Sequence, residues 1–186
     1  MTVDETSTDT QQPDGDLTAA DVAWDIDTIL PDGATPADLF DRADALADDL
    51  TSLRGRVGGL DAGELADAMH RLAELQDLMS RAGYHAMLAF STATDDPACG
   101  AAMAAAQERS TAIGTKLIFI DLEWAAADDD HVAAVLPDPR LDFCRHHLDN
   151  LRLSRPYLLS EAEETIVAEK SQTGFAAWTR LFDELT

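Results

Sequence analysis

The fold is decided most clearly by the stretch Ser154-Arg155-Pro156-Tyr157-Leu158-Leu159-Ser160-Glu161-Ala162-Glu163-Glu164, which is followed by Gly174-Phe175-Ala176-Ala177-Trp178. Pro156 ends the preceding helical pattern, because a proline restricts the conformation of the residue before it. Ser160 and Glu163 have the spacing of a capping box, in which the two side chains satisfy backbone N–H groups of the first helical turn. Gly174 then interrupts the helix. The stretch therefore predicts the end of one helix, a complete second helix and the start of a third.

Similar signals start the helices nearer the N-terminus. Thr35-Pro36-Ala37-Asp38 predicts a helix start, and apolar residues spaced by four and three continue to Val57. Asp61 and Glu64 again have capping-box spacing, and they begin a long amphipathic pattern that extends to about Phe90. We expect contacts from two directions on the last turns of this helix, which carry Tyr84, Met87, Leu88 and Phe90.

The following segments also predict helices. Asp96-Pro97 starts a third long helix. Its part 117–124 would suit a strand by propensity, but apolar residues there keep the helical period, which favours a helix. A short helix is predicted over 131–136, and another from Asp138-Pro139, with Leu141, Cys144, Leu148 and Leu151 facing inward. We therefore predict an all-α fold, an antiparallel multi-helix bundle with short loops.

The N-terminal segment differs from the rest of the chain. Residues 1–22 are polar and acidic with almost no large apolar side chain, so they cannot offset the entropy of ordering. We predict a disordered acidic tail over 1–22 and one helical lobe over 23–186. Trp24, the first large aromatic residue, is expected to anchor onto the first helices.

The composition favours a cytoplasmic protein. The 186 residues suffice for one domain with a core. The two cysteines, Cys99 and Cys144, are far apart and form no disulfide framework, which favours a reducing compartment. The N-terminus lacks the basic and apolar regions of a secretory signal, and no run of residues is long and apolar enough to predict a membrane span.

The charge excludes two kinds of partner. A formal net charge of −23 argues against nucleic acid and against anionic membrane surfaces, because both require Lys and Arg. The only lysines are Lys116 and Lys170. Such a surface suits a high-salt cytoplasm, where salt screens self-repulsion, and it equally suits a GC-rich genome that uses little lysine.

The histidines raise the question of a metal site. His146 and His147 are adjacent, with Asp142 four residues before His146 and Cys144 three before His147. Spacings of three or four place two ligands on one helix face, but adjacent histidines point about 100° apart, and no second cluster supplies further ligands. A helix cap or a polar surface patch is the favoured interpretation, and a metal site is the weaker alternative.

No other group of residues forms a complete site. Asp67 with His70 and Asp128 with His131 have the spacing of the Glu-x-x-His pairs in di-iron bundles, but the glutamate is missing. His85 is predicted to lie in the core or at an interface. No histidine is followed by glutamate, so the H-E-x-x-H motif is absent. We assign no catalytic, cofactor-binding or metal-binding residue and no cofactor to this chain.

Several features, taken in order, resemble a known family. They are Trp24-Asp25-Ile26, Tyr84-His85, the apolar patch 117–124, His146-His147-Leu148 through Arg152, the stretch 155–164, and Gly174-Phe175-Ala176-Ala177-Trp178 with Leu181-Phe182. Together they resemble the N-terminal region of the oligoendopeptidase F family, among the thimet-oligopeptidase-like zinc metallopeptidases. The resemblance extends over residues 24–186 and is closest over 113–186.

The resemblance implies a cytoplasmic, mostly helical endopeptidase that cleaves short peptides in a deep channel between two lobes. In that family zinc is bound by an H-E-x-x-H helix and a further glutamate, and the motif glutamate acts as general base on zinc-bound water. No position here matches those residues, so zinc belongs to the full-length family and the catalytic domain is absent from this chain. The resemblance makes residues 23–186 a lobe that walls the channel and is inactive alone.

The C-terminal helix carries a large apolar face. It consists of Phe175, Trp178, Leu181, Phe182 and Leu185. Such a face normally packs against another surface. We expect it to bind the missing catalytic lobe, or to mediate self-association through Phe175, Trp178 and Phe182. The alternative function is therefore a stand-alone helical interaction module derived from such a lobe.

Overall fold

The computed structural model describes residues 24–185, without the side chains of residues 180 and 183–185. The tail predicted over 1–22 and the side chain of Leu185 lie outside the described residues. Within 24–185 the regular structure is helical and contains no strand, which confirms the all-α prediction. The α-helices are α1 (Pro36–Leu50), α2 (Ala62–Thr92), α3 (Pro97–Ala126), α4 (Asp129–Val135), α5 (Arg145–Leu153), α6 (Glu161–Thr173) and α7 (Phe175–Leu185). The short 3-10 turns are η2 (Ile26–Ile29), η3 (Thr51–Leu53), η4 (Val57–Gly59), η5 (Pro139–Leu141) and η6 (Arg155–Tyr157).

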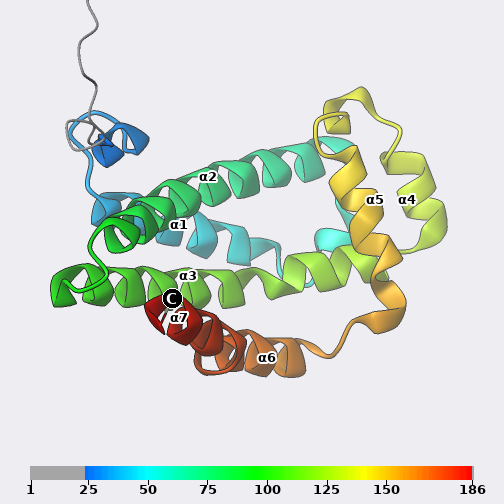
Figure 1. Cartoon of the computed structure of the whole chain (residues 1–186). Coiled ribbons are helices and arrows are strands. Elements are labelled where there is room, and N and C mark those ends of the chain that lie inside the picture. The colour runs from blue at the N-terminus through cyan, green and yellow to red at the C-terminus, as the bar shows by residue number, and fades with distance from the viewer. Residues whose placement is uncertain (1–23, 186) are drawn as a thin grey trace, which may run out of the picture.

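Three antiparallel helices form the body of the molecule (Figure 1). The long helices α2 and α3 lie side by side, and α1 packs against both of them. The segment from α4 to α5 closes the end at which α2 begins and α3 ends. From there α6 runs back along α3, and α7 follows it after Gly174. Helices α2 and α3 are thus covered by α1 on one side, and α5 and α6 border them on other sides.

Local capping explains where the helices begin. Helices α1, α2 and α6 each begin with a capping box. In a capping box the cap residue and the residue three positions later are joined through their side chains and backbone N–H groups. The pairs are Thr35 with Asp38, Asp61 with Glu64, and Ser160 with Glu163. These bonds satisfy N–H groups that no helical carbonyl can reach. The boxes predicted at Asp61 and Ser160 are therefore confirmed. The segment 117–124 is also helical as predicted, since α3 is unbroken.

The core is built on apolar side chains from α1, α2, α3 and α5. Trp124 of α3 is fully buried, and its indole Nε1 donates a hydrogen bond to the carbonyl of Leu148 in α5 at 3.0 Å. A buried indole N–H requires such an acceptor. Other fully buried side chains are Leu39, Leu50, Leu60, Leu65, Leu75, Ile113, Phe119 and Leu141.

The turn between α1 and α2 is held by Glu123 of α3. Its carboxylate accepts hydrogen bonds from the N–H of Gly55 at 2.6 Å and of Val57 at 3.0 Å. Gly55 has a φ of 80°, a region that favours glycine. A Cβ added to Gly58 would lie 3.0 Å from the carbonyl oxygen of Glu123. The turn therefore reaches α3 closely only because glycines stand at these positions.

One expectation about the N-terminal end is wrong. Trp24 is 81% exposed and does not anchor onto the helices. Polar contacts hold η2 on α2 instead: the ring Nε2 of His85 lies 2.9 Å from a carboxylate oxygen of Asp27, and Arg81 donates to the carbonyl of Ile29 at 3.1 Å. His85 therefore lies at an interface between two elements, as predicted.

The helix predicted from Asp138-Pro139 is also partly wrong, because it is interrupted. Residues Pro139–Leu141 form the short turn η5, and α5 begins only at Arg145. The guanidinium of Arg145 donates to the carbonyls of Leu136, Pro137 and Asp138, which stabilises a sharp turn ahead of the helix. Cys144 is therefore the N-cap residue of α5 and not a mid-helix residue. The predicted inward residues Leu141, Cys144 and Leu148 are buried, and Leu151 is half-buried.

Candidate functional site

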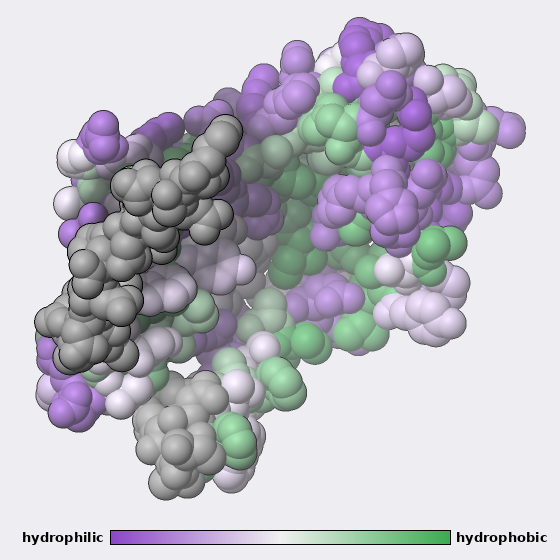
Figure 2. Space-filling model, turned by 45° about the horizontal axis from the view of Figure 1, so that its top comes forward, coloured by the Kyte–Doolittle hydropathy of each residue, from purple (hydrophilic) through white to green (hydrophobic). Residues whose placement is uncertain are grey.

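A groove runs along α2 and α3 on a side that no residue of α1 lines. Its first part, near α5, has a volume of about 430 Å³. Figure 2 shows hydrophobic surface in the hollowed middle of the molecule. The residues that line this part are Met69, Leu72, Ala73, Leu75, Gln76 and Met79 of α2, Gly114, Leu117, Ile118, Ile120 and Asp121 of α3, and Phe143, Cys144 and His147.

A second part continues the groove toward the other end of α2. It has a volume of about 360 Å³ and shares Gln76 and Met79 with the first part. Its remaining lining residues are Ser80, Gly83, Tyr84 and Met87 of α2, Met103, Ala106, Gln107 and Ser110 of α3, and Gln172 of α6. From Met69 to Met87 the two parts follow α2 for about 27 Å at 1.5 Å per residue. We call this continuous surface the α2–α3 groove.

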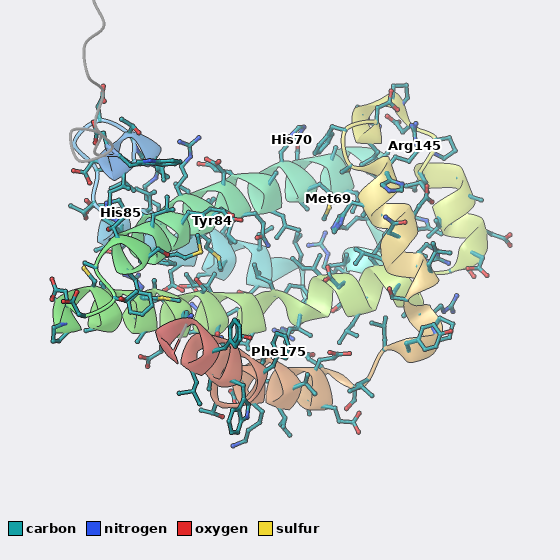
Figure 3. The ribbon with its side chains drawn as sticks, in the orientation of Figure 1. Met69, His70, Tyr84, His85, Arg145 and Phe175 are labelled. Carbon is teal, nitrogen blue, oxygen red and sulfur yellow. The ribbon has the colours of Figure 1, made fainter. Side chains whose placement is uncertain are left out.

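Methionines are concentrated in the α2–α3 groove. The chain has five methionines, and the four that lie within the described residues all line the groove. Met69 is buried, Met79 and Met103 are half-buried, and Met87 is 38% exposed. In Figure 3, Met69 lies on the groove side of α2 and its neighbour His70 lies on the opposite side. Methionine is flexible and polarisable, so such a surface can adapt to different apolar partners.

The C-terminal end of α2 agrees with the prediction only in part, because η2 contacts it through Arg81 and His85 whereas Tyr84 and Met87 are exposed. Tyr84 is 57% exposed and Met87 is 38% exposed, whereas Phe90 is buried. The last turns of α2 are therefore not packed from two directions at Tyr84 and Met87. Those side chains form the open wall of the second part of the groove.

Asp121 is the charged residue that lines the first part of the groove. Desolvation by surrounding apolar side chains raises the pKa of its carboxyl group, and the nearby imidazole of His147 lowers it by a smaller amount. Asp121 is nevertheless an exposed residue, because it lies on the wall of an open groove. The residues that line the second part carry no charge, and three of them are glutamines.

The predicted apolar face of α7 is exposed. Phe175 is 81% exposed, Trp178 is 71%, Leu181 is 43% and Phe182 is 65%. Phe175 lies at the junction of α6 and α7 (Figure 3). Gln172, two residues before the Gly174 break, lines the groove and donates to the hydroxyl of Thr111 in α3 at 2.7 Å. The root of α7 therefore lies at the rim of the α2–α3 groove.

The structure does not bring together the ligands weighed for a metal site near α5. The ring Nε2 of His146 lies 3.0 Å from the amide nitrogen of Asn150. The carboxylate of Asp142 accepts a hydrogen bond from Arg145. Burial raises the pKa of the Cys144 thiol, which disfavours the thiolate that binds metals. His147 lines the groove.

The other histidine pairs have structural contacts. His70 stacks on Phe143 with ring centroids 4.0 Å apart. Asp128 caps α4, and the ring Nε2 of His131 lies 3.1 Å from the carbonyl oxygen of Leu60. Within residues 24–185, no group of three or more His, Cys, Asp and Glu is placed to hold one metal ion. The described residues therefore do not fit a zinc site, and we derive no chemical step through zinc.

A comparison with known families finds a match for the C-terminal part of the chain. Residues 123–186, about a third of the chain, match the family model described as Oligopeptidase F, which represents an N-terminal part of these peptidases. This confirms the resemblance to the N-terminal region of the oligoendopeptidase F family on that segment. No curated protein and no solved structure matched the chain. The matched segment includes α4 to α7 and the end of α3.

The α2–α3 groove was missed by sequence reasoning. Its methionines occupy positions that also fit a helix core, and periodicity does not say which apolar stripe a neighbouring helix covers. One signal was available, because the last turns of α2 are apolar on more than one side.

The described helices also include none with the length and apolar content of a membrane span.

Proposed function

We propose that this chain is the N-terminal, channel-walling part of a zinc metalloendopeptidase that cleaves short peptides. The observation that carries the proposal is the family match over residues 123–186, a segment that contains α7 with its exposed apolar face. Trp178 on this face is 71% exposed. Such an exposed apolar face supports the attachment of a further lobe there. The chain would be inactive alone, because the zinc-binding motif belongs to that lobe, and it would act in the cytoplasm.

The α2–α3 groove supports the channel-walling role. An extended peptide spans about 3.3 Å per residue, so a groove of about 27 Å accommodates roughly eight residues. The methionines provide adaptable apolar contacts. The side-chain amides of Gln76, Gln107 and Gln172 provide donors and acceptors for a peptide backbone. Such a wall would accept unfolded peptides with little dependence on their side chains.

Peptide cleavage tests the proposal. The purified chain, with zinc and a quenched fluorescent peptide, is expected to give no chelator-sensitive hydrolysis. Adding a polypeptide that carries the H-E-x-x-H lobe of this family is expected to give a stable complex and zinc-dependent cleavage. Trp178→Ser should weaken that complex, whereas Tyr157→Ser, at another exposed aromatic residue, should not. Zinc-dependent hydrolysis by the chain alone, or no complex with the lobe, would overturn the proposal.

The alternative is a stand-alone helical interaction module. The same exposed face of α7 favours it, because an apolar surface of that size can bind a partner without any catalytic lobe. The coding sequence beyond the Thr186 codon distinguishes the two functions. An open frame with H-E-x-x-H supports the peptidase part, and a stop codon there supports the module.

A further inference from the structure

The α2–α3 groove and helix α7 have complementary surfaces within one chain. The second part of the groove is apolar and methionine-rich, and α7 presents Phe175 and Trp178 on an exposed face. An amphipathic helix that places its apolar side chains into a hydrophobic groove is a common mode of recognition. Methionine sulfur also makes favourable contacts with aromatic rings.

The dimensions of the two surfaces agree. Met79 and Met87 are about 12 Å apart along α2, at 1.5 Å per residue. Phe175 and Phe182 are about 10 Å apart along α7 by the same rise. Met103 and Gln107 of α3 form the opposite wall. The spacing of Phe175 and Phe182 along α7 therefore matches the span of the second part of the groove.

The charge distribution also favours the second part of the groove as the contact between two copies. Each chain carries a formal net charge of −23, so two copies repel each other over most of their surfaces. Among the described residues, those that line the second part of the groove carry no charge. Two acidic copies can meet there with the least repulsion, and salt will screen what remains.

The area is sufficient for an interface. An aromatic side chain buries about 150–250 Å², and Phe175 and Trp178 are 81% and 71% exposed. Covering these two residues on both copies removes roughly 600 Å² from water, and the groove walls lose a similar area. The total of roughly 1,200 Å² reaches the lower limit of stable interfaces.

We propose that two copies of this chain exchange helix α7, so that α7 of each copy occupies the second part of the α2–α3 groove of the other. The two contacts are equivalent, as in a closed twofold dimer. In this dimer the groove is blocked, so the isolated chain would be unable to receive a peptide there. The proposal depends on the groove and on α7, and not on the peptidase assignment.

Sedimentation of the full chain over a range of concentrations tests the exchange. The wild-type chain is expected to dimerise, at least about tenfold more tightly in 1 M salt than in 0.1 M. Trp178→Ser removes an anchor from α7, and Met87→Glu with Gln107→Glu adds a carboxylate to each wall of the groove. Each variant should dimerise at least about 30-fold more weakly. Tyr157→Ser, at a residue that is 83% exposed, is the matched control and should dimerise as wild type does.

Mixing the two variants gives the decisive result. The groove variant still offers an intact α7, and the Trp178→Ser variant still offers an intact groove, so one exchanged helix can hold a heterodimer. That contact is half of the interface, so the mixture should associate more strongly than either variant alone and more weakly than wild type. Circular dichroism verifies that both variants keep the wild-type helix content. A wild-type chain that stays monomeric, a groove variant that dimerises like wild type, or a mixture that associates no more than either variant alone would each overturn the exchange. None of these outcomes affects the peptidase proposal, which peptide cleavage tests.

Discussion

The body of α1, α2 and α3 and the C-terminal pair α6 and α7 differ in burial, although capping boxes begin helices in both. Capping boxes start α1, α2 and α6 alike. Helix α1 buries five residues, whereas α6 buries none. Polar contacts hold α6 to the body, through the ion pair of Arg54 with Glu161 and the hydrogen bond of Gln172 to Thr111. Local sequence therefore forms both groups of helices, but among the described residues only the body buries an extensive apolar surface.

The largest difference in the free energy of unfolding is expected between substitutions of two tryptophans. Trp124→Ala should lower the free energy of unfolding by about 3–5 kcal/mol, because it leaves a cavity in the core and removes the bond to Leu148. Trp178→Ala should change it by less than about 0.5 kcal/mol in dilute monomer, because Trp178 is 71% exposed. Urea unfolding followed by circular dichroism measures both values. Equal losses would show that α7 is part of the core.

A smaller effect is expected at two glutamates. Glu123→Ala removes the acceptor of the Gly55 and Val57 N–H groups, and should cost about 2 kcal/mol in the same unfolding experiment. Glu161→Ala breaks an exposed ion pair with Arg54, and should cost less than about 1 kcal/mol. A larger loss at Glu161 than at Glu123 would contradict the comparison.

Removing a helix cap should lower the free energy of unfolding by about 1 kcal/mol more in the body than in α6. Asp61→Ala removes the cap of α2 and should lower global stability by about that amount, because α2 belongs to the core. Ser160→Ala removes a similar bond from α6, but α6 buries no residue. We expect faster amide hydrogen exchange within α6 and little change in global unfolding. A global loss at Ser160 equal to that at Asp61 would show that α6 unfolds together with the body.

The smallest effect concerns Asp121. Its pKa is raised in the folded chain, mainly by desolvation, so the folded state binds the proton more tightly than the unfolded state does. The stability that the protonated form contributes is fully present below the unfolded pKa of about 4 and is lost as pH rises through the raised pKa. Asp121→Asn should therefore be a few tenths of a kcal/mol more stable than wild type at pH 7, after allowance for solvent screening. The difference should vanish near pH 3, and a variant less stable at pH 7 would contradict this sign.

Sequence reasoning identified the helices because their signals are local. The capping boxes at Asp61 and Ser160 and the break at Gly174 involve residues within a turn of each other, and the structure places all of them as predicted. The interruption before α5 was missed, because the contacts that stabilise it join Arg145 to carbonyl groups seven to nine residues earlier. Trp24 was misjudged for a related reason, since hydrophobicity alone does not supply a surface to pack on.

The sequence by itself determined the all-α class, the main helix starts, the acidic surface and the apolar face of α7. It also determined the likeness to oligopeptidase F over residues 123–186. Only the tertiary structure decided which apolar stripes are covered. It left the methionines of α2 and α3 along an open groove and placed the root of α7 at its rim through Gln172. The physical reason is that periodicity defines a face of a helix, whereas burial depends on a second surface that distant segments bring to it.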